Sequence, residues 1–256
     1  MPMRPAAMTD EDLHLGIAGD SASRKADRLR EERERRNSER SRLGRTWTGL
    51  FPSADERNRI ADERHWRVGA GGEQTLAALL AKRCPDVPML HDLAVPRSRA
   101  NIDHIAVAPS GVYVIDCKRY KGKIEVTAPL FGKPKLKIAG RDRTKLINGL
   151  DKQVAQVKAA LADNGEDVPV HGCLCFVAPE GFLADVGLPV LRTLKINGYS
   201  LYYAKRLAKR LNQRGPITAD HAQMLRTALA QRLPPASPTA EPPEPGSQEQ
   251  QGYPGS

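Results

Sequence analysis

The residues best suited to chemistry are two aspartates and a lysine on the two arms of one predicted hairpin. Asp103 lies in N-I-D-H-I-A-V-A, and Asp116 and Lys118 lie in V-Y-V-I-D-C-K. Because side chains alternate across a strand, Asp116 and Lys118 point to the same face of the sheet. Two carboxylates beside an ammonium group suit a divalent cation with oxygen ligands and an anionic substrate.

The connection between the two arms, P-S-G at residues 109–111, decides whether these three groups meet. If P-S forms a two-residue turn, Asp103 lies opposite Asp116, and if S-G forms the turn, Asp103 lies opposite Lys118. Both registers place the three groups on one face. A three-residue loop would instead pair Asp103 with Cys117, and Asp103 would then face away from Asp116 and Lys118. The prediction therefore depends on the turn.

A fourth acidic group, Glu73, belongs to a helix predicted to begin after G-A-G-G at residues 69–72. Leu76, Ala77 and Leu80 follow Glu73 at helical spacing, so Glu73 shares the apolar face that packs on the sheet. A carboxylate on that face is costly unless it is paired, hydrogen-bonded or near a metal ion. The alternative is a glutamate in the first turn of a helix, where the helix dipole stabilises it.

These residues together permit metal-assisted cleavage of a phosphodiester. Asp103 and Asp116, with the carbonyl oxygen of Cys117, are expected to hold Mg²⁺ or Mn²⁺, and Glu73 a metal-bound water or a second ion. Such an ion polarises a phosphoryl oxygen and acidifies a bound water. Lys118 is expected to orient or help deprotonate the attacking water and to balance the charge of the transition state.

The charge of the chain favours a polyanionic partner, because the formal net charge is +10 and the isoelectric point is about 9.6. Residues 24–45 carry ten Lys or Arg against five acidic residues, and residues 118–145 carry ten against two. The second block begins at the predicted site, so we expect it to bind nucleic-acid phosphates in a salt-dependent way. The cations assigned to that role are Arg119, Lys121, Lys123, Lys133, Lys135, Lys137, Arg141, Arg143 and Lys145.

The order of the predicted elements indicates an α/β fold in which helices flank a mixed sheet. The Glu73 helix is followed by a strand at residues 87–95, the two hairpin arms and a small basic ribbon. A helix at residues 144–162 then leads to an almost continuously apolar strand at residues 170–178, which is typical of a sheet centre. Strand, helix and strand in this order imply a crossover to a parallel neighbour. Further elements are expected at residues 194–203 (strand), 204–211 (helix) and 218–233 (helix capped by Thr218).

The chain divides into a globular domain with extensions on both sides. Residues 1–20 are expected to be disordered, and residues 21–65 to form an Arg/Glu-rich helical extension and linker with a short second helix at residues 54–63. Residues 66–233 form the globular domain, and the Pro-rich tail at residues 234–256 has too few apolar residues to fold. The polar helix of the extension is either a solvated segment or an arm that contacts nucleic acid.

Composition predicts a cytoplasmic protein without a membrane segment. No apolar run approaches the roughly 18 residues of a membrane span, and the N-terminus does not resemble a signal peptide. The four cysteines show no C-x-x-C pattern and are expected to be buried, reduced thiols. The six histidines form no metal-binding spacing. His104 is expected to be structural, because it lies on the face opposite Asp103.

Three segments resemble the nuclease-related domain (NERD) of the PD-(D/E)xK restriction-endonuclease-like superfamily. They are G-A-G-G-E at residues 69–73, N-I-D-H-I at residues 101–105 and G-V-Y-V-I-D-C-K-R-Y-K-G at residues 111–122. The resemblance extends over about residues 66–233, and it implies a three-layer core with a mixed central sheet flanked by helices. One departure from the superfamily pattern is Ile102, which stands where the superfamily name has a proline.

The resemblance also implies an active centre. Glu73, Asp103, Asp116 and Lys118 match the catalytic residues of the family, and Gln153 matches a glutamine on the following helix that often belongs to the site. The implied activity is that of a metal-dependent nuclease, and we expect DNA to be its substrate. Two alternatives stay open: a catalytically inactive nucleic-acid-binding module, and an interaction protein recruited through the basic helix.

Overall fold

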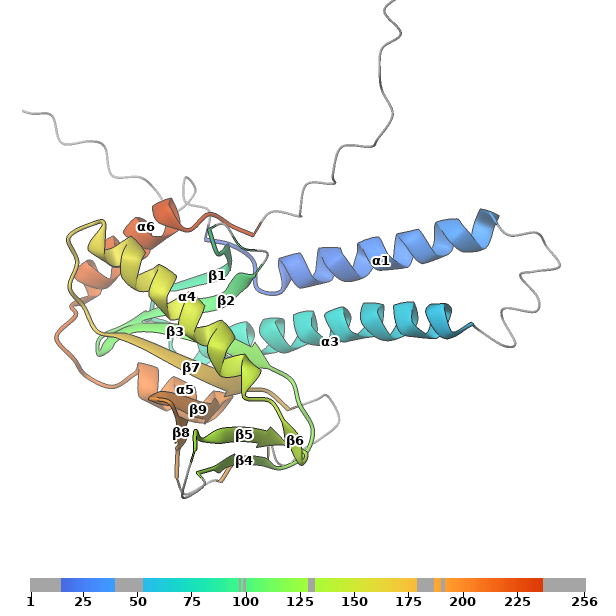
Figure 1. Ribbon diagram of the computed structural model, residues 1–256. Helices are drawn as coiled ribbons and strands as arrows, with labels where there is room; N and C mark the ends of the chain where they lie inside the picture. The colour runs from blue at the N-terminus through green and yellow to red at the C-terminus, as the bar shows by residue number, and fades with distance from the viewer. Residues whose placement is uncertain are drawn as a thin grey trace, which may run out of the picture.

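The computed structural model describes most of the chain (Figure 1). The described residues are 15–39, 53–96, 98, 100–128, 132–178, 187–189 and 192–236. Among them, no helix has the length and apolar character needed to cross a membrane. The predictions of disorder for residues 1–14 and 237–256, and of a linker at residues 40–52, lie outside the described residues.

A six-stranded mixed sheet lies at the centre of the fold. In spatial order its strands are β1 (Met89–Ala94), β2 (Asn101–Ala108), β3 (Gly111–Lys118), β7 (Val170–Phe176), β9 (Tyr199–Tyr203) and β8 (Leu194–Ile196). β1, β2 and β3 are antiparallel neighbours, β3, β7 and β9 run parallel, and β8 returns antiparallel to β9. The predicted apolar strand therefore lies inside the sheet, as β7.

Helices cover both faces of this sheet. The helices are α4 (Lys145–Ala162) and α6 (Ala219–Arg232) on one face, and α3 (Ala54–Arg83) and α5 (Ala204–Leu211) on the other (Figure 1). Val114 packs with Val154 in the core beneath α4, while Ile115 packs with Leu76 in the core beneath α3. Because β3 is buried on both faces, it needs apolar side chains at successive positions. The predicted three-layer α/β core is confirmed.

The break predicted at residues 69–72 does not occur, because α3 runs unbroken from Ala54 to Arg83. Each glycine inside a helix costs roughly 1 kcal/mol relative to alanine. Here the small residues allow close packing, since a Cβ on Gly72 would lie 3.4 Å from the Cβ of Arg119. A Cβ on Gly19 would lie 2.8 Å from the carbonyl oxygen of Ala70. The predicted helix start was wrong because tertiary packing outweighs the local propensity of these residues.

The helical extension forms a hairpin with α3. Helix α1 (Asp20–Glu39) lies antiparallel beside α3, and the pair projects from the three-layer core (Figure 1). Glu63 of α3 is only 6% exposed and pairs with Arg33 of α1 at 3.2 Å and with Arg67 at 2.9 Å. Helix α1 is therefore packed on α3, and the predicted start of the globular domain at residue 66 falls inside α3.

Segments from both sides of the core pair with the edge strand β1. The amide of His91 donates to the carbonyl of Leu15 at 2.9 Å, and the amide of Ala94 donates to the carbonyl of Pro234 at 2.7 Å. An edge strand without such partners would present unpaired backbone groups. Both segments pack beside β1, although both fall in stretches that the sequence predicts to be disordered.

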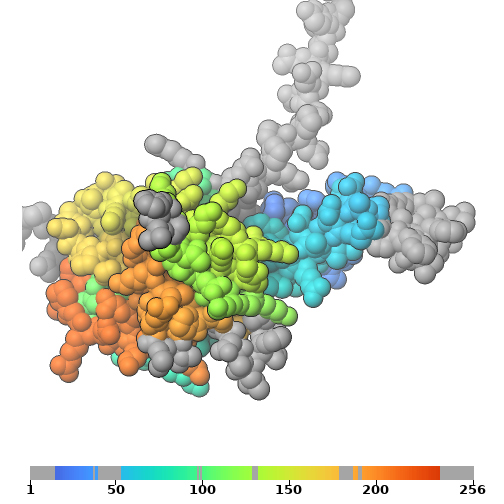
Figure 2. All heavy atoms as spheres, turned by 60° about the horizontal axis from the view of Figure 1, so that its bottom comes forward, coloured from blue at the N-terminus to red at the C-terminus, as the bar shows by residue number. Residues whose placement is uncertain are grey.

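A small separate sheet follows β3. Its strands are β4 (Ile124–Thr127), β5 (Lys135–Ile138) and β6 (Arg141–Asp142), which are antiparallel. Leu136 and Ile138 are buried, while Lys135 and Lys137 alternate with them and face the other way. In Figure 2 the yellow-green atoms of this sheet lie at the surface. The predicted basic ribbon is thus present next to the end of β3.

Candidate active site

The register of the β2–β3 hairpin brings the two aspartates together. Ala108 pairs with Gly111, so P-S forms the two-residue turn and Asp103 lies opposite Asp116. This is the first of the two registers described above that place the three groups on one face. Lys118 lies on the same face as Asp116, because the two are separated by one residue of β3.

The backbone pairing of β2 with β3 ends just before the aspartates. Its last pair is His104 with Ile115. Beyond this pair, Oδ2 of Asp103 accepts a hydrogen bond from the amide of Cys117 at 2.7 Å. A side chain therefore provides the acceptor that a strand carbonyl would otherwise offer, and it fixes the position of the Asp103 carboxylate.

Lys118 lies between the two carboxylates. Its Nζ is 2.7 Å from Oδ1 of Asp116 and 3.8 Å from Oδ2 of Asp103, and it donates to the carbonyl of Cys117 at 3.0 Å. Burial alone would lower the pKa of Lys118, but the carboxylates of Asp116 and Asp103 outweigh it and raise that pKa above the usual range. Lys118 is therefore a protonated cation at neutral pH.

Asp103 can change its charge near neutral pH. Burial raises the pKa of Asp103 to about 7; Lys118 opposes this rise, and the charge of Asp116 adds to it. Asp103 and Asp116 are only 5% and 6% exposed, so water screens neither charge effectively. One lysine beside two buried carboxyls leaves an excess of negative charge when both are ionised.

Glu73 lies deep in α3 rather than in its first turn, so the helix dipole does not stabilise its carboxylate. The side chain is buried, and Oε2 has no hydrogen-bond partner among the described residues. Burial is the largest cause that raises the pKa of Glu73 to about 9, followed by the negative charge of Asp103. A buried oxygen without a partner marks a place where a proton, a water or a cation is needed.

Gln153 reaches the same strand end from α4. Its Nε2 donates to the carbonyl of Asn101 at 2.9 Å, two residues before Asp103 on β2. Its side chain is 7% exposed, and Oε1 has no hydrogen-bond partner among the described residues. The structure therefore places a second partnerless oxygen beside β2, from the residue that the family resemblance selects.

A further buried acid, Asp92, escapes the sequence-based prediction. Its Oδ2 accepts from the amide of Ser21 at 2.5 Å, and its Oδ1 accepts from the Ser21 hydroxyl at 2.7 Å and from Nδ2 of Asn101 at 2.6 Å. Asp92 thus stabilises the start of α1 and, through Asn101, links it to the strand that carries Asp103. An aspartate inside the strand M-L-H-D-L-A was the available signal, because aspartate is depleted in strands.

His104 lies on the other face of β2 and contacts another histidine. Its Nδ1 is 2.8 Å from Nδ1 of His91, and burial lowers the pKa of both rings. Both rings are therefore neutral at pH 7 and share one proton in the bond. This arrangement agrees with the structural role expected for His104.

The nine cations assigned to nucleic-acid binding have different surroundings. Arg119 is half-buried against Gly71 and Gly72 of α3, while Lys123 pairs with Glu125 at 2.6 Å. Lys137 and Arg143 are half-buried. The exposed members are Lys121, Lys123, Lys133, Lys135, Arg141 and Lys145. Most of the predicted set thus remains a cationic surface on and around the small sheet.

The donor atoms of the site suit a hard cation. Asp103, Asp116 and Glu73 offer carboxylate oxygens, and the oxygens of Glu73 and Gln153 noted above lack partners. In the described part of the chain, however, no three His, Cys, Asp or Glu side chains gather at metal-binding spacing. The ammonium group of Lys118 balances one of the two negative charges of Asp103 and Asp116.

Comparison with known proteins agrees with this arrangement. Residues 68–177 match the family model of the nuclease-related domain (NERD). No curated protein and no solved structure matched the chain. The matched segment contains Glu73, Asp103, Asp116, Lys118 and Gln153, and the three-layer core around it is consistent with the PD-(D/E)xK superfamily. This match covers 110 of the 256 residues, so the chain contains a segment that is similar to the nuclease-related domain.

Proposed function

We propose that this protein is a metal-dependent nuclease of the NERD family that hydrolyses DNA phosphodiester bonds. The observation that supports this most is the cluster at the ends of β2 and β3, in which Asp103 and Asp116 flank the protonated Lys118. Carboxylate oxygens suit Mg²⁺ or Mn²⁺, and an ammonium group suits a phosphate. The family match supports an association with nucleic acid.

The groups that would hold Mg²⁺ or Mn²⁺ are the carboxylates of Asp103, Asp116 and Glu73 and the carbonyl oxygen of Cys117. When bound, such an ion supplies Lewis acidity and lowers the pKa of a water ligand. Because metal ligands must be deprotonated, Glu73 and Asp103 would lose their protons on binding.

Lys118 acts as a fixed cation in this proposal. Its raised pKa keeps the proton on Nζ, so Lys118 orients the attacking water and balances negative charge rather than accepting a proton. Asp103, with a pKa raised to about 7, is the acid best matched to proton exchange near neutral pH, whereas Glu73, with a pKa raised to about 9, keeps its proton there unless a metal ion displaces it. Oε2 of Glu73 would be available to such an ion, since it has no hydrogen-bond partner among the described residues.

A nucleic-acid-binding module without cleavage is the second candidate. It is favoured by the ion pair of Lys118 with Asp116, which already neutralises a carboxylate that a metal ion would need. The exposed cations of the small sheet would bind phosphates in either case, and that binding would weaken as salt rises. The two candidates differ in one expectation: cleavage requires the negative charge of Asp116, whereas binding of nucleic acid alone does not.

The experiment is a cleavage assay on labelled single- and double-stranded DNA and RNA with Mg²⁺, Mn²⁺ or EDTA. Asp116→Asn and Lys118→Met are compared with wild type, and Asp167→Asn and Lys82→Met are matched controls, because Asp167 and Lys82 are exposed and lie outside the site. We expect cleavage of DNA with a divalent ion, no cleavage in EDTA, and a loss of about 100-fold or more in both site variants. Thermal unfolding of each variant checks that the fold is intact.

Cleavage that is equal in wild type and in both site variants would overturn the proposal. Binding without cleavage under every divalent ion, unchanged in Asp116→Asn, would support the second candidate instead. The cytoplasm remains the expected location of either activity, and the free state of all four cysteines agrees with it.

A further inference from the structure

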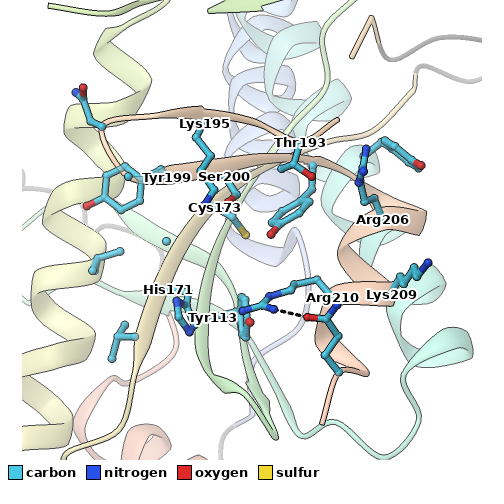
Figure 3. A pocket seen from close by; sticks show the side chains of 18 of the residues that line it. Tyr113, His171, Cys173, Thr193, Lys195, Tyr199, Ser200, Arg206, Lys209 and Arg210 are labelled. Carbon is cyan, nitrogen blue, oxygen red and sulfur yellow. Dashed lines mark hydrogen bonds between the residues drawn. The ribbon is translucent and has the colours of Figure 1, made fainter. Parts of the chain in front are cut away.

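A basic groove lies apart from the cluster of Asp103, Asp116 and Lys118. It has a volume of about 930 Å³ and is lined by residues of α4, β7, β8, β9 and α5 (Figure 3). It opens where the sheet is incomplete, because β9 pairs with β7 only from Cys173 onward and leaves the first residues of β7 uncovered. Gly172 of β7 belongs to the floor, since a Cβ there would lie 2.6 Å from the ring of Tyr199.

The lining of this groove carries positive charge from several elements. Its described residues include no aspartate or glutamate. The six cations are Lys158, Lys195, Lys205, Arg206, Lys209 and Arg210. Figure 3 shows Lys195 reaching the groove from the β8 side, while Arg206, Lys209 and Arg210 come from α5. Like charges held together in a recess produce a strong positive potential, which attracts an anion.

The lysines among these cations are available to a ligand. Lys158, Lys195, Lys205 and Lys209 are exposed, and no ion pair joins them to a carboxylate of the described chain. Lys205 and Lys209 are one helical turn apart on α5, so their charges follow one line along the groove. A row of exposed cations along a groove fits a ligand with several negative charges in series.

We propose that this groove binds a segment of single-stranded nucleic acid. The cations would contact successive phosphates, and the partly exposed rings of Tyr199 and Tyr203 offer surfaces on which bases can stack. A cationic groove that combines phosphate contacts with aromatic rings is the general solution for binding a single strand. A single strand, unlike a duplex, has unpaired bases that can stack on these rings.

The groove and the active site lie on the same two parallel strands. Lys118 at the end of β3 pairs with Phe176 at the end of β7, while the groove uses the start of β7 at residues 170–173. These residues lie three to six positions from Phe176 along β7, which corresponds to a separation of about 10–20 Å. The idea that the groove holds the substrate strand rests on the proposed nuclease function. Binding of a strand in the groove does not depend on cleavage.

The test is fluorescence anisotropy with a labelled 20-nucleotide oligo-dT in EDTA, in the Asp116→Asn background so that no cleavage occurs. Lys205→Gln/Lys209→Gln removes two charges from α5, and Lys158→Gln/Lys195→Gln removes two from the other wall. The matched control is Lys25→Gln/Lys82→Gln, because both lysines are exposed and lie outside the groove. The affinity is measured from about 50 to 200 mM salt.

We expect each groove variant to bind oligo-dT about tenfold or more weakly near 0.1 M salt, and the control to bind like wild type. The slope of log K against log salt should become shallower by about 1.4, since each phosphate contact to a single strand contributes about 0.7. An abasic strand of equal length should bind more weakly than oligo-dT, because it has no bases to stack. The second double variant keeps the test valid if the first does not fold.

Wild-type affinity and slope in both groove variants would overturn the proposal. So would equal competition by polyglutamate of the same charge, because the groove would then bind any polyanion. A loss of binding in Lys135→Gln/Lys137→Gln alone would place the strand on the small sheet instead of the groove. The nuclease proposal fails separately, if the wild-type chain shows no cleavage while oligo-dT binding still depends on the groove.

Discussion

The carboxylate of Asp103 caps the end of the β2–β3 pairing, because its Oδ2 accepts a hydrogen bond from the amide of Cys117 at 2.7 Å. The same oxygen is 3.8 Å from Nζ of Lys118. One atom therefore serves the fold and the charge of the site together. These two roles can be separated by substitution, since asparagine retains an acceptor oxygen and loses the charge.

Asp103→Asn is expected to fold like wild type and to lose divalent-dependent cleavage. Asp103→Ala should lose cleavage as well, but it should also be less stable by about 1–3 kcal/mol, because it leaves the buried Cys117 amide without its acceptor. Urea unfolding in EDTA measures the difference between the two variants. Equal stability of the alanine and asparagine variants would contradict the capping role.

Lys118→Ala is expected to destabilise the fold by about 3 kcal/mol near pH 8, because it leaves Asp116 and Asp103 buried without their cation. The loss should be smaller near pH 5, where Asp103 is protonated in the fold and needs no counterion. Urea unfolding at the two pH values measures it, with Lys82→Ala as the exposed control. A loss that does not depend on pH would contradict this account.

Glu73 makes the metal-free protein less stable as pH rises. Its pKa is raised from 4.5 when unfolded to about 9 in the fold, so the folded state holds the proton more tightly than the unfolded chain. The stabilisation is complete below pH 4.5 and is lost as pH rises toward 9. The Tm in EDTA should therefore fall between pH 5 and pH 9.

Glu73→Gln tests this pH dependence, because glutamine mimics the protonated acid at every pH. It should raise the Tm at pH 8 by about 3 °C or more, which corresponds to about 1 kcal/mol in a domain of this size, and it should flatten the pH profile. Mg²⁺ should stabilise wild type more at pH 8 than at pH 6, because its ligands must lose their protons. A wild-type profile as flat as that of Glu73→Gln would contradict the pKa assignment.

Asp92→Ala is expected to loosen α1 and to destabilise the chain by about 2 kcal/mol. The substitution removes the acceptor of the Ser21 amide and hydroxyl and of the Asn101 side chain. Hydrogen exchange should show faster exchange in α1 and unchanged exchange in α4. Asp92→Asn, which keeps an acceptor at this left-handed position (φ 48°), should show a smaller effect.

Unchanged protection of α1 in Asp92→Ala would mean that the pairing of Glu63 with Arg33 holds this helix in place by itself. In that case Glu63→Gln should loosen α1 instead. The two variants together therefore assign the anchor of the helical hairpin.

Local sequence patterns determined most of the fold. The alternation around Asp116 and Lys118 and the apolar run of β7 each predicted an element that the structure contains. The helical period of α4 and the Thr218 cap of α6 did the same. These signals are strong because each depends on residues that are neighbours along one element. The order of the acidic motifs likewise sufficed to select the family and its candidate residues.

The tertiary structure decided the features that depend on distant contacts. The P-S turn that sets Asp103 opposite Asp116 could not be chosen from a connection compatible with several lengths. Helix α3 continues through its glycines, where Gly72 lies against Arg119, 47 residues away, and Ala70 lies against Gly19, 51 residues away. Asp92 links α1 to the strand of Asp103 only because the fold brings Ser21 and Asn101 within hydrogen-bond distance of its carboxylate. Sequence alone therefore identified the chemical groups, whereas packing between distant segments decided their charge and their partners and formed the separate basic groove.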